Sequence, residues 1–397
     1  MVYHENDSGV VNDNVKVCVR ARGLLGSNEV GRNTCLTALP SQNAIMINAK
    51  PDPKLFAFDY VADEHTTQEQ LFDSVARPLV DSFIGGYNAC IFAYGQTGSG
   101  KSYTIMGGGD VNQSDQNGLI PRTFQHLFTT LNNNQSSSIN NSYEDDSNDN
   151  NNNEEDNRLQ SYKCTLSFLE IYNEQIMDLF VDTSPNLSIR EDIKKGIYVE
   201  GLREIEITDT QTAMELLEIG IANRHVAETA MNSNSSRSHS VLTINLESTV
   251  CIKQTKDGLT KNKYSRLSLI DLAGSERQKS TEAAGTRLKE AGSINKSLSC
   301  LGNVIRSLVD LANGKPRHVQ YRDSKLTFLL KRAKNIRNMA IVNEEASGSD
   351  CRSTVATVRD ENTPFGSVAL TFVGARGIGV AATPKDGAGT TLSEVAL

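Results

Sequence analysis

The chain has 397 residues, 38% of them hydrophobic and 22% charged, which is the composition of a globular protein of one or two domains. No apolar stretch is long enough to span a membrane, and the polar, acidic beginning MVYHENDSGV is unlike a signal peptide. The cysteines contain no C-x-x-C pair, which argues against a disulfide framework and for buried, reduced thiols in a cytosolic setting: Cys18, Cys35, Cys90, Cys164, Cys251, Cys300 and Cys351.

The formal net charge of −8 argues, taken alone, against an acidic binding partner. However, seven acidic residues lie in one polar tract, between residues 144 and 156, that contains no basic residue. Without them the formal charge is −1. The average therefore hides the charge distribution of the folded part of the chain.

The first predicted strands lie on either side of a long stretch without a motif. Val15, Val17 and Val19 alternate along the chain and predict a strand over Val15–Arg20, which follows a flexible N-terminus at residues 1–13. The run from Ala89 to Tyr94 is short and wholly apolar, which is typical of a buried central strand.

The stretch GQTGSGKSY, residues 95–103, follows this strand and fits the pattern G-x-x-x-x-G-K-[ST]. Glycines let successive backbone N–H groups turn inward around a phosphate. Lys101 would reach the β- and γ-phosphates of a nucleotide, and the Ser102 hydroxyl would ligate Mg²⁺. The alternative is an ordinary glycine turn with a surface lysine. In that case residues 95–102 would match the whole pattern by chance, at a place directly after a strand, where phosphate loops occur.

Residues 132–157 are almost wholly Asn, Ser, Asp and Glu. Such a segment cannot bury enough apolar surface to offset its ordering entropy, so we predict a disordered surface loop inside one domain. Tyr162–Tyr172 after it is typical of a strand. Apolar residues before it follow helical spacing and predict a helix: Ile120, Phe124, Leu127, Phe128 and Leu131.

Further elements alternate along the second half of the chain. We predict helices near Thr212–Ala222 and over Ile294–Ala312, and strands over Ser240–Ser248 and Arg266–Ile270. Strands that alternate with helices around a phosphate loop imply an α/β sheet covered on both faces.

Two motifs accompany these elements. LSLIDLAGSE, residues 267–276, is apolar up to Asp271 and then turns. Asp271 is placed to hold Mg²⁺ through water and Gly274 to bring a backbone N–H to a γ-phosphate, although an ordinary polar turn after a strand explains the same residues equally well. NSNSSRSH, residues 232–239, is either a polar loop or a hydroxyl cluster that ligates Mg²⁺ and orders with the γ-phosphate.

Together, GQTGSGKS, NSNSSRSH and DLAGSE resemble the motifs of the kinesin motor domain, over residues 14–346. Phe56–Val61 is similar to a strand of that family, and residues 277–305 are most similar to the phragmoplast and spindle-type kinesins of class twelve. The resemblance implies the P-loop NTPase fold, an α/β fold with a central, mostly parallel twisted sheet flanked by helices on both faces.

The resemblance also implies an enzyme, a microtubule-stimulated ATPase that uses ATP and Mg²⁺. Ser102 and Ser236 would ligate Mg²⁺, with Asp271 supporting it through water. Lys101 and the backbone of Gly274 would contact the γ-phosphate. Catalysis in such a site consists mostly of positioning and charge neutralisation.

Arg237 and Glu276 would form the salt bridge that closes the pocket and positions the attacking water. With Lys101, Ser236 and Gly274 they make up the implied catalytic set. The implied nucleotide contacts are Arg20, Arg22, Gly95, Gln96, Thr97, Gly98, Ser99, Gly100, Lys101, Ser102, Tyr103, Asn232 and Ser235.

The adenine side departs from the family pattern. That pattern is R-x-R-P with an aromatic residue or His after the phosphate loop, and Arg20, Arg22 and Tyr103 match it. Gly23 replaces the proline, so one packing wall is altered, and we expect weaker base stacking rather than loss of binding.

Microtubules are the implied partner, bound through basic side chains that face the acidic surface of tubulin. The implied contact residues are Lys279, Arg287, Lys289, Lys296, Lys315, Arg317, Arg322 and Lys325, with Arg277, His318, Arg190, Lys194 and Lys195 nearby. A solvated charged surface is the alternative for any one of them. Contacts of this kind are sensitive to salt.

The likeness breaks after YRDSKLTFLL. In kinesins this stretch leads into a buried strand and a final helix before an R-A-K-x-I-x-N segment begins the neck linker. Here it runs straight into KRAKNIRNMAIVNEE, so we expect a fold incomplete at its C-terminal end and a neck-linker-like segment at residues 331–346. The missing strand would expose two rows of unpaired backbone groups, and only the apolar tail around Val368–Val373 is a candidate to fill the gap.

Residues 347–397 form a tail that resembles no part of a kinesin, and they carry no heptads, so we expect no dimerising coiled coil here. Two hypotheses remain: an ATP-dependent microtubule motor, or a nucleotide- and microtubule-binding protein without productive motility. A P-loop GTPase fits poorly, because an N/T-K-x-D motif is absent. The resemblance implies the cytoplasm and the microtubule cytoskeleton, at the spindle or phragmoplast, without a nucleic-acid partner.

Overall fold

The computed structural model describes residues 15–23, 36–47, 52–108, 114–140, 157–193, 196–230, 235–252, 259–275, 286–312, 314–331 and 336–345. Its strands are β1 (Val15–Arg22), β2 (Leu36–Leu39), β3 (Ala44–Ile47), β4 (Lys54–Ala57), β5 (Tyr60–Ala62), β6 (Asn88–Tyr94), β7 (Asn157–Tyr172), β8 (Gln175–Asp178), β9 (Ser188–Asp192), β10 (Gly196–Glu200), β11 (Ile205–Glu206), β12 (Ser238–Ile252), β13 (Leu259–Asp271) and β14 (Ile336–Glu345).

The α-helices are α1 (Gln68–Leu71), α2 (Arg77–Ile84), α3 (Lys101–Ile105), α4 (Leu119–Asn140), α5 (Thr210–Ala230), α6 (Thr286–Ala312) and α7 (Lys325–Leu330). A π-helical turn, Phe72–Ala76, joins α1 to α2. Within the described part of the chain, no helix is both long and apolar enough to cross a membrane.

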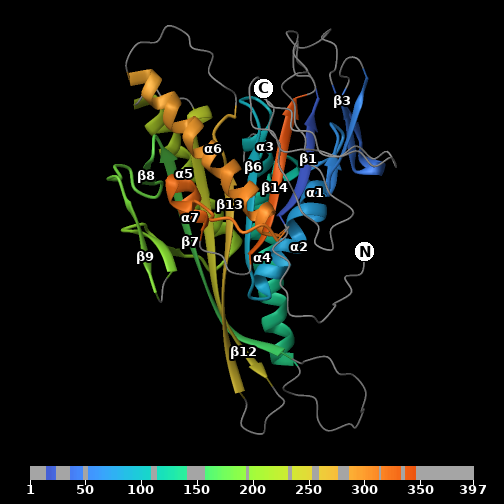
Figure 1. Ribbon diagram of the computed structural model, residues 1–397. Coiled ribbons are helices and arrows are strands. Elements are labelled where there is room, and N and C mark those ends of the chain that lie inside the picture. Colours follow the sequence, from blue (N-terminus) through green and yellow to red (C-terminus); the bar gives the residue numbers. More distant parts are fainter. Residues whose placement is uncertain are drawn as a thin grey trace.

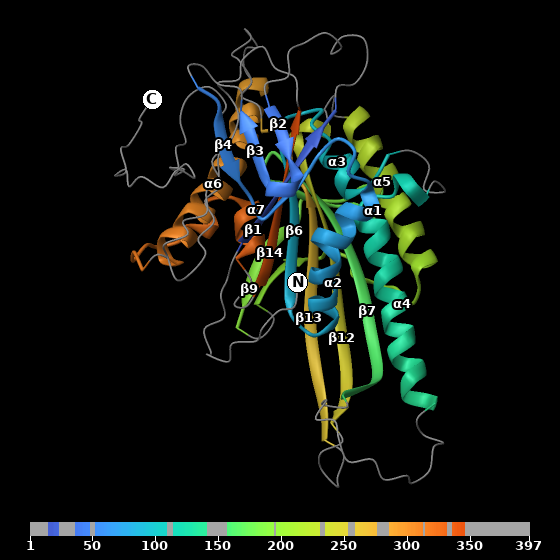
Figure 2. The same cartoon turned by 90° about the vertical axis from the view of Figure 1, so that its right-hand side faces the viewer.

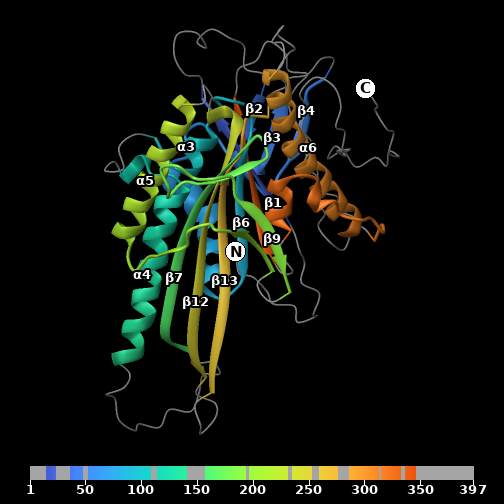
Figure 3. The same cartoon turned by 90° about the vertical axis from the view of Figure 1, so that its left-hand side faces the viewer.

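A nine-stranded sheet forms the centre of the molecule, in the order β11-β7-β12-β13-β6-β14-β1-β5, with β8 paired to β7. The half from β13 to β5 is parallel, whereas β7, β8, β11 and β12 pair antiparallel. Helices α2, α4 and α5 cover one face and α6 and α7 the other (Figures 1, 2 and 3). The predicted α/β fold with two covered faces is therefore confirmed, with a mixed sheet.

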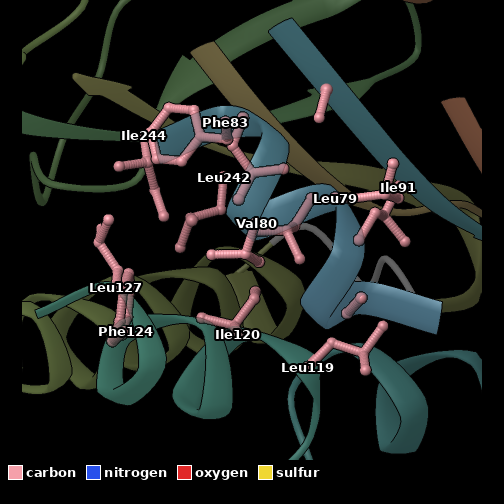
Figure 4. Close-up of a cluster of buried hydrophobic side chains, with 14 of the residues drawn as sticks. Leu79, Val80, Phe83, Ile91, Leu119, Ile120, Phe124, Leu127, Leu242 and Ile244 are labelled. Atoms are coloured by element: carbon pink, nitrogen blue, oxygen red, sulfur yellow. The ribbon is translucent and has the colours of Figure 1, made fainter. Parts of the chain in front are cut away.

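One core lies under α2 and α4. Phe83 of α2, Phe124 and Leu127 of α4, and Leu242 and Ile244 of β12 are all fully buried there and point toward one another (Figure 4). The helical spacing predicted in the sequence supplies the α4 residues, and alternate positions of β12 supply the others. This apolar packing fixes β12, which leads from the hydroxyl-rich motif.

A second core lies on the opposite face, under α6 and α7. Leu298, Leu301 and Ile305 of α6 pack there with Leu326 of α7 and with Phe92 of β6. Successive residues of β6 enter the two cores in turn, as expected of a strand buried on both faces, and this is why its sequence is continuously apolar.

The predicted strands and helices are found, and most of them are longer than predicted: β13, for example, begins at Leu259 and α6 at Thr286. The predicted loop at residues 132–157 is wrong at both ends, because α4 continues to Asn140 and β7 begins at Asn157. A helix anchored by buried apolar residues can extend into polar sequence when the added side chains face water. Residues 141–156 lie outside the described part.

Phe56–Val61, expected as one strand, is split between two sheets. β4 pairs with β3 in a small three-stranded sheet, whereas β5 pairs with β1 in the large one. The change of sheet occurs at Asp59, whose carboxylate accepts the Val17 N–H at 2.8 Å and whose own N–H donates to the Val17 carbonyl at 3.1 Å.

The strand that we expected to be missing from the centre of the sheet is present. β14 lies between β1 and β6 and pairs with both in parallel, with Ala340 opposite Val17 on one side and Phe92 on the other. The expectation that only the tail around Val368–Val373 could fill this position is wrong, and that tail lies outside the described residues. The IRNMAIV run has the apolar content that a central strand needs. We did not predict a strand there because the same residues resemble a neck linker.

Candidate functional site

The loop at residues 95–100 follows β6 and has the backbone shape that its glycines predict. Gly95, Gly98 and Gly100 have φ angles of 152°, 84° and 97°, in the region that other residues rarely adopt. Lys101 opens α3, is only 7% exposed, and donates from Nζ to the Gln96 carbonyl at 2.8 Å. The ammonium group is thus buried and bonded to a carbonyl of the same loop.

Ser102 and Asp271, far apart in the sequence, meet at the end of this loop. The Ser102 hydroxyl donates to Asp271 Oδ2 at 2.6 Å. β13 and β6 are parallel neighbours with Asp271 opposite Ala93, so the carboxyl ends of both strands reach the same edge of the sheet. Asp271 is 2% exposed, and its Oδ1 has no hydrogen-bond partner among the described residues.

The loop after Asp271 is bonded to both neighbouring motifs. Leu272 N–H donates to the Ala93 carbonyl at 3.3 Å, and Ser275 N–H donates to the Gly95 carbonyl at 3.1 Å. Gly274 N–H, expected to face a γ-phosphate, donates instead to the Ser236 carbonyl at 2.7 Å. A phosphate contact at Gly274 would require exchange of that bond.

The hydroxyl-rich motif contains a 3₁₀ turn at Ser235–Arg237 that leads into β12. Arg237 is half-buried there. Asn232 and Glu276 lie outside the described residues, so the expected bridge from Arg237 to Glu276 stays a prediction.

Arg224 of α5 is a residue of the site that the sequence analysis missed. Its side chain is 7% exposed, and it lies 3.5 Å from Glu170 of β7 and 3.5 Å from Asp271. It also donates to the Ser238 hydroxyl at 3.2 Å and the Ser240 hydroxyl at 3.4 Å. A lone arginine on a helix gives no motif, and only the fold brings it to the strand-end carboxylate.

His239 closes the hydroxyl-rich motif and was likewise not assigned a role. It is 2% exposed; Nδ1 accepts the Ala273 N–H at 2.9 Å, and Nε2 lies 2.7 Å from the Ser297 hydroxyl of α6. Burial lowers the pKa of His239 to about 3, with further lowering by the positive charges of Arg224 and Lys101. The imidazole is therefore neutral near pH 7.

Two of the expected adenine contacts, Arg20 near the end of β1 and Tyr103 in α3, lie side by side. Arg20 donates to Gln68 at 2.8 Å and to Thr104 at 3.0 Å, and its guanidinium lies 5.2 Å from the centre of the Tyr103 ring. Arg22 donates to the Gly23 carbonyl at 3.1 Å.

At position 23 a Cβ would lie 2.7 Å from the Glu64 carboxylate. That carboxylate is the end of a flexible, exposed side chain that can turn aside, so the contact does not explain why glycine stands there.

The basic residues expected to meet a track are divided among several segments. Lys296 is exposed on α6 and Lys315 on the loop before α7, whereas Arg317 pairs with Asp310. No side-chain structure is described for Arg287 and Lys289, and Arg277, Lys279, Lys194 and Lys195 lie outside the described residues.

Glu191 of β9 and Glu174 of the turn between β7 and β8 hold the segment around α7. Arg322 and Lys331 lie 2.6 and 2.7 Å from the two Glu191 oxygens, and both lower the pKa of that carboxyl group. The Lys325 N–H donates to Glu174 at 2.9 Å. Figure 3 shows α6 and β9 on the same side of the sheet.

Comparison with known proteins now gives this site a context. The family described as kinesin motor domain matches residues 20–360. Kinesin-like protein KIF15-B of Xenopus laevis is 44% identical over 85% of this chain, and KIF15 of Rattus norvegicus is 42% identical over 93%. Kinesin-like protein KIN-12D of Arabidopsis thaliana is 46% identical over 89%, which agrees with the predicted likeness to class twelve.

A solved structure gives the same result. It is described as the structure of a fast kinesin, with implications for ATPase mechanism and interactions with microtubules. The TM-score is 0.70 at 37% identity, covering 84% of this chain and 86% of that one. The chain spans only 26%, 28% and 12% of the lengths of the three relatives named above. On the family match and these identities together, the chain belongs to the kinesin motor-domain family.

Proposed function

We propose that this chain is an ATP-dependent microtubule motor that hydrolyses ATP to drive movement. The observation that carries the proposal is the meeting of Ser102 and Asp271 at 2.6 Å, beside a phosphate loop bonded to the Gly274 loop. Nucleotide binding follows from the family, whereas the activity of the whole protein is part of the proposal, because the chain covers a fraction of its relatives' length.

The residues present fit a Mg²⁺–nucleotide. Hydroxyl and carboxylate oxygens are the ligands that Mg²⁺ prefers, and Asp271 Oδ1 is a buried acceptor without a partner in the described part of the chain. Ser102 and Ser236 would hold the ion, with Asp271 behind them. When bound, Mg²⁺ would neutralise charge on the phosphates.

Lys101 would hold the γ-phosphate with its buried ammonium group. The backbone N–H groups of residues 95–102 would bind the other phosphate oxygens, and Arg20, Arg22 and Tyr103 would surround the base. Gly274 N–H would leave the Ser236 carbonyl to reach the γ-phosphate. Loss of the γ-phosphate would therefore change both the Gly274 loop and the hydroxyl-rich motif that contains Ser236. Arg237 and Glu276 would then orient the attacking water.

Microtubules are the proposed track. The basic residues Lys296, Lys315, Arg317, Arg322 and Lys325 lie on α6, on α7 and on the loop between them, and the remaining contacts would come from Lys279, Arg287 and Lys289. Because such contacts are exposed ion pairs, the affinity for microtubules should fall as salt rises. The family places the chain with the cytoskeleton, and we propose the spindle or phragmoplast microtubules as its location.

The test compares the wild-type chain with Lys101→Ala and with a control, Lys54→Ala, an exposed lysine on β4. We expect ATP turnover that microtubules stimulate in wild type and control, and a loss of more than about a hundredfold in Lys101→Ala, because the γ-phosphate loses its main cation. Turnover in Lys101→Ala within about tenfold of wild type would refute the site assignment.

Movement needs its own test. Purified chains fixed to a surface should glide microtubules when ATP is added and stop when it is replaced by ADP. Stimulated ATP turnover without gliding would refute the motor function and leave the ATPase assignment in place.

A further inference from the structure

His239 joins three segments that lie far apart in the sequence. It is the second residue of β12 and lies two residues after the end of the 3₁₀ turn. One ring nitrogen accepts a bond from the loop after Asp271, at Ala273, and the other contacts Ser297 of α6. His239 and Ser297 are each 2% exposed, so water does not compete for these bonds.

The bonds fix the state of the ring. A backbone N–H can only donate, so Nδ1 must carry the lone pair that accepts from Ala273. In the neutral ring the proton is then on Nε2, which donates to the Ser297 hydroxyl. One side chain is therefore bonded to the loop after Asp271 through Nδ1 and to α6 through Nε2. A change in the position of either segment acts on the same ring.

In the proposed function, the two segments that His239 joins contact different partners: the loop after Asp271 contacts the nucleotide, and α6 contacts the track. The loop is bonded at Ser275 to the Gly95 carbonyl of the phosphate loop and at Gly274 to the Ser236 carbonyl. α6 carries Lys296, an exposed residue adjacent to Ser297 and one of the proposed track contacts. The bond at Ser297 is 2.7 Å long, and a shift of α6 by more than about half an ångström would take it beyond the range of ordinary N–H···O bonds.

We propose that His239 is a positioning residue that couples α6 to the phosphate site, so that binding of α6 to the track changes the loop at Ala273 and Gly274. This inference rests on the proposed function. It assigns the coupling to one bond, from Nε2 to Ser297. A histidine with only a structural role would hold the fold together but would leave microtubule stimulation unchanged when that bond is removed.

Variants of Ser297 test the α6 end. Ser297→Ala removes the acceptor and Ser297→Thr keeps a hydroxyl. Ser307→Ala is the control, because that buried serine of α6 bonds only to the Asn303 carbonyl of its own helix in the described contacts. For Ser297→Ala we expect unstimulated turnover within about twofold of wild type and a stimulated kcat lowered about tenfold, at an unchanged KM for microtubules. The stimulation should be normal in Ser297→Thr and in Ser307→Ala.

Variants of His239 test the other end. An Asn oxygen can take the place of Nδ1 and keep the Ala273 bond, whereas a Gln amide can take the place of Nε2 and keep the Ser297 bond. His239→Asn should therefore lose stimulation as Ser297→Ala does, and combining the two should cause no further loss. A double variant whose losses multiply would overturn the proposal, as would normal stimulation in a folded Ser297→Ala chain.

The outcomes separate this inference from the proposed function. A wild-type chain without ATP turnover or without microtubule stimulation refutes the proposed function, and the inference with it. A stimulated wild type together with an equally stimulated Ser297→Ala refutes the inference alone. If Ser297→Ala does not fold, His239→Asn decides the question through the same ratio of stimulated to unstimulated turnover.

Discussion

Lowering the pH should destabilise the chain through His239, by an amount that follows from its burial. Burial lowers the pKa of this side chain from 6.5 to about 3 in the folded state. Between these values the unfolded chain binds the proton and the folded chain does not, so stability falls as the pH drops below 6.5 and continues to fall toward 3. The loss approaches about 1.4 kcal/mol per pH unit, or roughly 2 kcal/mol by pH 5.

The assay is urea unfolding at pH 7.5 and pH 5, for the wild type and for His239→Gln, which does not titrate. All other side chains are the same in both proteins, so their contributions cancel in the comparison. We expect His239→Gln to be less stable than wild type at pH 7.5 but to lose about 2 kcal/mol less on acidification. An equal loss in both proteins would show that the imidazole is accessible to protons in the folded chain, against its 2% exposure.

Three substitutions test the packing of the helices against the sheet. Arg224→Ala should lower the free energy of unfolding by about 3–5 kcal/mol, because it removes a buried cation that lies 3.5 Å from both the Glu170 and the Asp271 carboxylates; a loss below 1 kcal/mol in urea unfolding would contradict this. Gly220→Ala should cost about 1–3 kcal/mol, since its Cβ would lie 2.3 Å from Phe168, whereas Gly302→Ala in α6, with nothing within 4 Å, should be neutral or stabilising. Equal thermal midpoints of the two glycine variants would refute the overpacking argument.

The elements with strong periodicity could be predicted from the sequence. β6 is apolar throughout because alternate residues enter cores on opposite faces, and α4 shows the helical spacing of one buried side. Limits were less predictable, since α4 runs on to Asn140 through residues of low apolar content. Helix extension there depends on a helix already formed, which a local composition does not report.

Some residues of the candidate site could likewise be predicted from the sequence and others could not. The phosphate loop and Asp271 carry motifs whose residue types are dictated by phosphate and Mg²⁺ chemistry, so they could be named in advance. Arg224 and Ser297 carry no such signal. Their importance arises from the packing of α5 and α6 against the sheet, which brings them to Asp271 and His239 over long sequence separations. Contacts of this kind appear only with the fold.

β14 shows how a resemblance can mislead about structure. The likeness of residues 331–346 to a neck linker led us to expect an empty position in the sheet, yet Ile336–Glu345 pairs with β1 along Val15–Arg22 and with β6 along Asn88–Tyr94. A central parallel position needs a strand with both rows of backbone groups bonded. The chain meets that need with the segment that follows α7.

Truncation tests whether β14 is the strand that completes the fold. A chain that ends at residue 346 keeps β14 and loses only the tail, whereas a chain that ends at Lys331 loses both. We expect the first to unfold cooperatively at the midpoint of the full chain, and the second to lack a cooperative transition, because β1 and β6 are then left with unpaired backbone groups in the middle of the sheet. Circular dichroism during thermal unfolding distinguishes them. A shorter chain as stable as the longer one would show that β14 adds nothing to the sheet, and loss of folding in both would assign the stabilising role to the tail.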